Sequence, residues 1–235
     1  MTIDELKNCA ENNLNLDLNN YLKQISELSK SDNVEHPLVN SDAKIYNFDS
    51  IVKSVFNGHP SPASVDGLYF SKFRNENGLV LIEFKTGFNQ RITSETFDID
   101  KCKCPHTDKT NQINCKDYGT ILLENQDLKS AELLDSLRLK AVESYLVLEK
   151  LFYGTEKTLI EIPIKMIVVV DVNVLETEEN ALADLAAKTP KNNKIQAVKN
   201  AISRFSSDKY KLYREIEVFS AMDFEKMCEK ANFIV

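Results

Sequence analysis

The stretch Gly78-Leu79-Val80-Leu81-Ile82-Glu83-Phe84-Lys85 is an apolar run that ends on two charged residues. Side chains alternate between the two faces of a strand, so Glu83 and Lys85 share one face, roughly 7 Å apart along the chain. Val80 and Ile82 then point to the opposite face, where a helix can cover them. The stretch therefore predicts a strand with one apolar face and with a carboxylate and an ammonium at its end.

A second strand is predicted upstream at residues 64–70, Ser-Val-Asp-Gly-Leu-Tyr-Phe, which contain Asp66. The polar segment 72–77 has the composition of a turn, and a turn there would make the two strands antiparallel neighbours. Asp66 would then lie close to Glu83, so that two carboxylates and an ammonium converge at one end of a sheet. Such a group suits a hard divalent cation, Mg²⁺ or Mn²⁺, beside a base or a charge stabiliser. The alternative is an exposed strand end, with a surface Glu–Lys pair and with Asp66 in a turn beside Gly67.

The remaining elements predict an α/β fold, in which a mixed sheet carries helices on its faces. Apolar residues at helical spacing predict helices within residues 1–30, 48–56, 127–153 and 191–205, and a last helix that begins near residue 220. Further strands are predicted at residues 43–46, 162–172 and 212–219. We expect one domain over residues 1–235, with N-terminal helices (1–57), a cysteine-containing insertion (88–125) and a basic C-terminal elaboration (177–235).

Composition is that of an ordinary globular protein, because 43% of the 235 residues are apolar and 28% are charged. No apolar run approaches the roughly 20 residues of a membrane helix. The first residues also lack the basic and apolar regions of a signal peptide. We therefore expect a cytoplasmic protein with no membrane partner. Five cysteines, an odd number, argue against a framework of disulfides.

The charge of the chain is uneven. A net charge of −7 disfavours nucleic-acid binding in general, because backbone phosphates attract positive surfaces. Residues 188–214, however, contain eight Lys or Arg residues against a single acid, Asp208. Lys191, Lys194, Lys199 and Arg204 are the candidate nucleic-acid contacts in this segment. The alternative is the solvated face of a helix.

Asp66 is followed, after a gap of sixteen residues, by Glu83-Phe84-Lys85 at the end of an apolar strand. A long helix and a buried strand come next along the chain. In this order the chain resembles the PD-(D/E)XK nuclease superfamily, over roughly residues 48–172. The resemblance implies a restriction-endonuclease-like mixed sheet and hydrolysis of phosphodiester bonds, most often those of DNA. It also implies that Asp66 and Glu83 ligate one or two Mg²⁺ ions and that Lys85 assists the attacking water. Many members dimerise, so a homodimer is compatible with it.

The chain departs from that family at three places. Val65 stands where the family has a proline directly before the Asp. Some members add an acid from the first helix, and Glu5, Glu11, Glu27, Glu35 and Asp49 are the candidates here. A helical Gln or Lys assists in related enzymes, and Gln126, Lys129 and Lys140 are near the corresponding element. These departures favour an alternative function, a catalytically idle module of the nuclease fold that binds nucleic acid or a protein partner.

Cys102, Cys104, His106 and Cys115 bring three thiols and an imidazole together within a short segment. Four such ligands would satisfy tetrahedral Zn²⁺, which would also explain how a long polar insertion is ordered. A single residue between the first two cysteines is a tighter spacing than zinc sites usually have. A structural Zn²⁺ site and a surface loop with incidental thiols are therefore both open interpretations.

Overall fold

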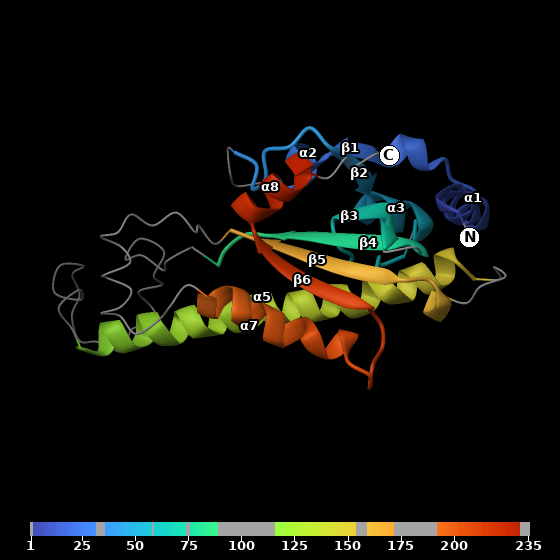
Figure 1. Cartoon of the computed structure of the whole chain (residues 1–235). Coiled ribbons are helices and arrows are strands. Elements are labelled where there is room, and N and C mark those ends of the chain that lie inside the picture. Colours follow the sequence, from blue (N-terminus) through green and yellow to red (C-terminus); the bar gives the residue numbers. More distant parts are fainter. Residues whose placement is uncertain are drawn as a thin grey trace.

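The computed structural model describes residues 2–31, 36–57, 59–73, 76–88, 116–153, 159–171 and 192–230. They form a mixed six-stranded sheet with helices on both faces, which confirms the expected α/β class (Figure 1). β1 to β4 are antiparallel neighbours, whereas β4, β5 and β6 are parallel. The strands follow the sheet in sequence order: β1 (Leu22–Gln24), β2 (Lys44–Asn47), β3 (Gly67–Phe73), β4 (Glu76–Lys85), β5 (Ile164–Val170) and β6 (Glu215–Ser220).

Two apolar clusters lie on opposite faces of the sheet. The larger cluster includes residues of α1 (Ile3–Leu14), α3 (Phe48–Val55), α5 (Lys116–Leu151) and α7 (Asn192–Ile202). The smaller one includes residues of α2 (Ile25–Leu28) and α8 (Ala221–Lys230). Short 3₁₀ helices occur at η1 (Leu18–Tyr21), η3 (Leu159–Glu161) and η4 (Ser203–Ser206). No helix in the described ranges combines the length and the apolar composition needed to cross a bilayer.

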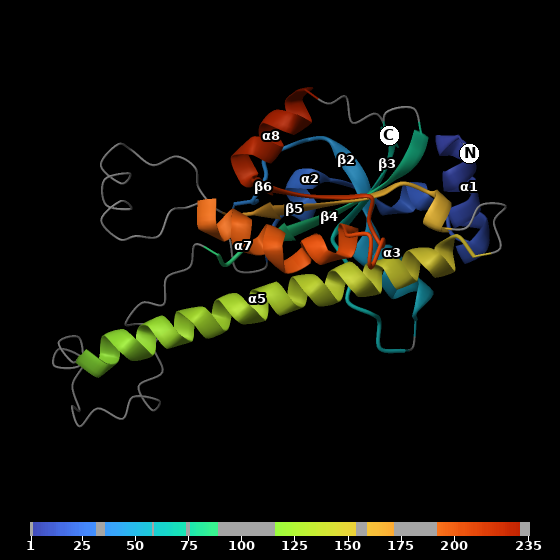
Figure 2. The same ribbon diagram turned by 60° about the horizontal axis from the view of Figure 1, so that its bottom comes forward.

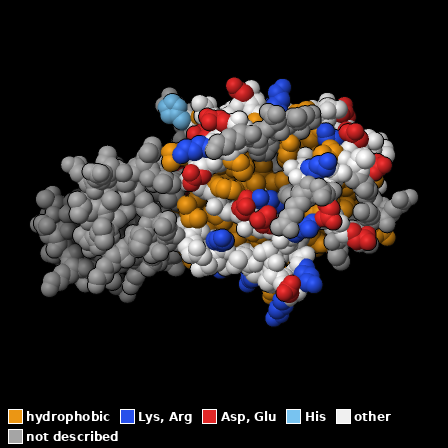
Figure 3. All heavy atoms as spheres, in the orientation of Figure 1, with side chains coloured by type: hydrophobic (Ala, Val, Ile, Leu, Met, Phe, Trp, Pro, Cys, Tyr) orange, Lys and Arg blue, Asp and Glu red, His pale blue; other side chains and the backbone are white. Residues whose placement is uncertain are grey.

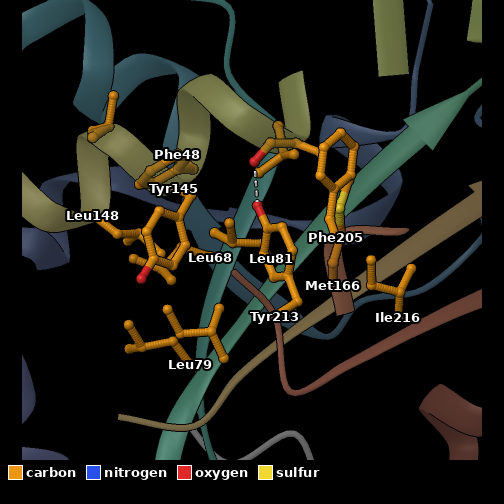
Figure 4. Packing of buried hydrophobic residues seen from close by; sticks show 14 of the residues in the cluster. Phe48, Leu68, Leu79, Leu81, Tyr145, Leu148, Met166, Phe205, Tyr213 and Ile216 are labelled. Carbon is orange, nitrogen blue, oxygen red and sulfur yellow. Dashed lines mark hydrogen bonds between the residues drawn. The ribbon is translucent and has the colours of Figure 1, made fainter. Parts of the chain in front are cut away.

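The strand β4 alternates as predicted. Leu79 and Leu81 belong to the larger cluster, whereas Val80 and Ile82 belong to the smaller one. Figure 4 shows the larger cluster, in which the buried Tyr213 hydroxyl donates a hydrogen bond of 2.5 Å to the carbonyl of Ala141. This bond joins the segment before β6 to α5 within the apolar core.

The hairpin of β3 and β4 is also as predicted, with Gly67 opposite Ile82. The strand β3 begins at Gly67, however, so Asp66 directly precedes the strand and does not lie within it. The carbonyl of Asp66 accepts a hydrogen bond from the backbone N–H of Phe48, where α3 begins. A Cβ at Gly67 would lie 2.4 Å from Cδ1 of the buried Ile45, so a residue without a side chain lets β3 approach β2 here.

The chain reaches the parallel strands through helices. α5 connects β4 to β5, and α7 precedes β6, as parallel neighbours require a long crossover. Figure 2 shows α5 and α7 side by side along the sheet, and Arg138 Nε of α5 donates to the carbonyl of Ala201 in α7 at 3.2 Å. Because Lys85 is paired with Val170, the carboxyl ends of β4 and β5 meet at one edge of the sheet.

Two predicted boundaries are wrong. α1 ends at Leu14, since Asn15 adopts a left-handed conformation with φ of 52°, and the helical spacing that follows is divided among η1, β1 and α2. The pairing of Leu22 with Tyr46 overrides helix formation there. α5 begins at Lys116, so the end of the expected irregular insertion is helical.

Candidate metal centre and active site

The candidate site begins with two carboxylates at the end of the β3–β4 hairpin. The register that pairs Gly67 with Ile82 places Asp66 opposite Glu83. Oδ2 of Asp66 accepts a hydrogen bond of 2.7 Å from the backbone N–H of Phe84, which fixes the aspartate against β4. The predicted convergence of the two acids is therefore present in the fold.

A lysine from α5 lies between these carboxylates. Nζ of Lys140 donates to Oε1 and Oε2 of Glu83 at 2.9 and 2.8 Å. The same atom lies 3.5 Å from Oδ1 of Asp66. Three carboxylate oxygens from two residues thus converge on a single positive charge.

Lys85 points to the same face as Glu83, as the alternation in β4 predicted. Its Nζ donates to Oγ of Ser136 in α5 at 3.1 Å. The exposed strand end considered as an alternative is wrong, because the Glu83 side chain is only 1% exposed and both charged residues face α5.

α5 also holds the segment that leads into Asp66. Oγ of Ser144 accepts from the backbone N–H of Val65 at 3.0 Å, and the Glu143 carboxylate accepts from the N–H of Ala63. Ser136, Lys140 and Ser144 are four residues apart and therefore form one polar line along the helix. This line contacts Lys85, then Glu83 and Asp66, then Val65.

Burial dominates the electrostatics of the acids. It raises the pKa of Glu83 to about 8, with a further rise from the Asp66 carboxylate, against the opposing effect of Lys140. Burial likewise raises the pKa of Asp66, although Lys140 and the N–H of Phe84 oppose the shift. Each acid therefore needs a cation beside it to be stable as an anion.

The two lysines are shifted in opposite directions. Burial lowers the pKa of Lys85. The Glu83 carboxylate opposes this shift, and the Lys140 ammonium lowers the pKa further. Burial alone would lower the pKa of Lys140 too, but the carboxylates of Glu83 and Asp66 raise it. A lysine with a lowered pKa thus stands beside a lysine with a raised pKa.

Asp49 is the candidate acid from the N-terminal helices whose charge reaches the site, since it raises the pKa of Asp66. It lies in α3, where it accepts a hydrogen bond of 2.9 Å from Ser64 and pairs with Lys53 at 2.5 Å. The other candidates have different contacts or none described. Glu5 caps α1, Glu11 accepts from the N–H of Leu18, Glu27 pairs with Lys23, and Glu35 lies outside the described residues.

The donor set fits a hard divalent cation. Mg²⁺ binds through one or two carboxylates and keeps several waters, so two converging acids are sufficient. The oxygens of Asp66 and Glu83 already surround one cationic group, the Lys140 ammonium. Within the described ranges, no group of three or more His, Cys, Asp or Glu side chains is arranged to hold a metal ion.

Other predicted site residues lie elsewhere. Cys102, Cys104, His106, Cys115 and Lys191 are outside the described residues, so the zinc hypothesis stays a prediction. Lys194 lies in α7, Lys199 is exposed on the same helix, and the exposed Arg204 lies in η4 with its guanidinium 4.8 Å from the centre of the Phe205 ring. On the face shown in Figure 3, acidic and basic side chains are interspersed and form no single basic area among the described residues.

Asp171 directly follows β5, at the end of the sheet that carries the candidate site. Its carboxylate accepts hydrogen bonds from the backbone N–H groups of Gly87 at 2.8 Å and Phe88 at 3.0 Å. Gly87 has φ of 104°, a conformation that favours glycine. The chain that leaves β4 is therefore fixed to the end of the neighbouring strand.

Comparison of the chain with protein-family models, curated proteins and solved structures returns no match.

Proposed function

We propose that this protein is a metal-dependent nuclease that hydrolyses phosphodiester bonds of DNA. The observation that carries the proposal is the convergence of Asp66, Glu83 and Lys85 at the carboxyl end of β4, where β4 and β5 end together. Two converging carboxylates and an amine with a lowered pKa are the groups that this hydrolysis needs.

Asp66 and Glu83 would hold the metal ion, Mg²⁺ or Mn²⁺. Such an ion supplies charge neutralisation on the phosphate and a more acidic bound water. Lys85 is the proposed base or charge stabiliser. Its lowered pKa increases the fraction of neutral amine, which can accept a proton from the attacking water, and its protonated form can stabilise negative charge on the phosphate.

The order of elements supports a restriction-endonuclease-like fold. A hairpin that carries the acids is followed by the long helix α5 and by β5, parallel to β4, as in the PD-(D/E)XK resemblance. The family's missing proline has a local reason. The N–H of Val65 donates to Ser144 Oγ, and proline has no N–H to donate.

The test is cleavage of single- and double-stranded DNA and RNA with Mg²⁺ or Mn²⁺. Wild type is compared with Glu83→Gln and Lys85→Met, and with the exposed controls Glu215→Gln and Lys226→Met. We expect both site variants to lose at least about 100-fold in rate and both controls to retain the wild-type rate. Cleavage of none of these substrates by wild type, or an unchanged rate in the two site variants, would overturn the proposal.

A second candidate is the catalytically idle module that binds nucleic acid or a protein partner. The ion pair of Lys140 with Glu83 favours it, because the ammonium already neutralises the buried carboxylate. Salt-dependent DNA binding that survives Glu83→Ala, without cleavage by wild type, would support this function. Lys199 and Arg204 are the exposed residues proposed to contact the phosphates.

A further inference from the structure

Lys140 occupies the position that a metal ion would need. Its Nζ is within 3.5 Å of three carboxylate oxygens, two from Glu83 and one from Asp66. A Mg²⁺ ion bound by the same oxygens would lie about 2.0–2.1 Å from each of its ligands. The Lys140 ammonium and a divalent cation cannot both contact these oxygens, because like charges repel strongly in a buried site.

The Glu83 carboxylate cannot leave, but the Lys140 ammonium can. The side chain of Glu83 is 1% exposed and belongs to β4, between β3 and β5. The side chain of Lys140 is 23% exposed and ends a flexible four-carbon stem. Its neighbours in α5, Leu137 and Ala141, are fully buried, which holds the helix in place. An exchange of cations would therefore move the Lys140 side chain and leave the backbone unchanged.

The charge balance also favours exchange. The two carboxylates contact the Lys140 ammonium directly, whereas Nζ of Lys85 is hydrogen-bonded to Ser136. When both acids are ionised, a divalent ion matches their charge, which a single lysine does not.

We propose that Lys140 is the resident counter-ion of the metal site: Mg²⁺ or Mn²⁺ binds to Asp66 and Glu83 in exchange for the Lys140 ammonium, which turns toward solvent. The inference rests on the proposed function in that the cation is the metal of the nuclease. Lys140 is then a positioning residue that holds the two acids in place before the metal arrives, and that weakens metal binding by competing for the same oxygens.

The experiment is titration of Mn²⁺ by calorimetry into wild type, Lys140→Met and Lys140→Gln, with Lys226→Met as an exposed control. We expect both Lys140 variants to bind Mn²⁺ at least tenfold more tightly than wild type and the control to bind like wild type. Adding Glu83→Gln to Lys140→Met should abolish the gain. Equal or weaker binding by both Lys140 variants would overturn the exchange.

Folding of the variants gives a second readout, because removal of Lys140 leaves Asp66 and the buried Glu83 without their cation. We expect Mn²⁺ to raise the melting temperature of Lys140→Met and Lys140→Gln more than that of wild type. Failure of both variants to fold even with Mn²⁺ would overturn the proposal, since the metal would then be unable to replace the ammonium. Neither readout uses cleavage. Tighter metal binding without any nuclease activity would contradict the proposed function alone, whereas active wild type with no gain in the variants would contradict the exchange alone.

Discussion

Glu83 is a carboxylic acid in an almost completely buried position, so its ionisation is linked to folding. A buried anion is unfavourable unless it is paired and hydrogen-bonded. Lys140 provides both the charge and the hydrogen bonds, one to each oxygen. The stability of the chain should therefore respond to the protonation of this one group.

The first prediction concerns stability and pH. The pKa of Glu83 is about 8 in the folded chain, against 4.5 for an ordinary glutamate. Between these values the folded chain binds more protons than the unfolded chain, so the free energy of unfolding falls as pH rises. From about pH 5 to about pH 8 we expect wild type to lose more stability than Glu83→Gln, by roughly 1 kcal/mol for every pH increment of one in that range.

Urea denaturation of both proteins across this pH range measures the effect. Asp66, whose pKa is also raised, acts in the same direction and is common to both proteins. Glu215→Gln makes the same chemical change at an exposed position and should follow wild type. Identical pH profiles for wild type and Glu83→Gln would contradict the prediction.

Asp66, Glu83 and Lys85 could be placed together from the sequence because a hairpin relates its residues by simple alternation and by the position of its turn. Lys140 was one of three candidates for an assisting helical residue, but its ion pair with the two acids could not be predicted, since that pair depends on how α5 is rotated against the sheet. A lysine on a helix is usually solvated. A further signal was the line Ser136, Lys140 and Ser144, which repeats every four residues beside the apolar stripe of the same helix.

At the scale of elements, α5 is the support of the site. Ser144 is fully buried and satisfies the N–H of Val65, which is fully buried as well. A buried donor without a partner costs the free energy of its lost hydration. The segment that leads into Asp66 should therefore depend on a single hydroxyl of this helix.

The second prediction is that Ser144→Ala lowers the free energy of unfolding by about 1–3 kcal/mol, because it leaves the Val65 N–H unpaired. Ser136→Ala is the matched control on the same helix. Ser136 is half-buried and water can replace its hydroxyl, so we expect a loss below about 1 kcal/mol. Urea denaturation measures both free energies of unfolding. Equal losses in the two variants would contradict the prediction that the Val65 hydrogen bond stabilises the fold more than the Lys85 one.

Element boundaries were predicted less well than the elements themselves. The apolar stripe of α5 includes the buried residues Leu137, Ala141 and Leu148, as the spacing indicated. The start of the helix at Lys116 was not predicted, since the residues there lack a clear apolar stripe. The local spacing at β1 and α2 predicts a helix, because it carries no information on the pairing of β1 with β2, which lies further along the chain. Pairing between distant segments is the information that local spacing lacks.

At the scale of the whole molecule, an acidic chain must meet an acidic polymer if it is a nuclease. The net charge is −7, so binding requires a local basic surface or a metal ion. Lys199 and Arg204 are exposed on the side of the sheet that α7 covers, whereas Lys226 is exposed on α8 at the other side. The two sides can therefore be compared directly.

The third prediction is that Lys199→Glu combined with Arg204→Glu weakens DNA binding. The slope of log affinity against log salt should also become shallower, by roughly one for each phosphate that the protein no longer neutralises. Lys226→Glu changes the net charge without touching that side and should change the slope little. Fluorescence anisotropy at several salt concentrations gives both quantities. A larger effect of Lys226→Glu would move the binding surface to the side of α8.

The hydrogen bonds from Gly87 and Phe88 to Asp171 have a practical consequence for protein engineering. They fix the chain at the end of β4 to the residue that follows the neighbouring strand β5. None of Asp66, Glu83, Lys85 and Lys140 takes part in these hydrogen bonds. Asp171 can therefore be substituted to alter the path of the chain after β4 while the residues that perform the proposed chemistry stay unchanged.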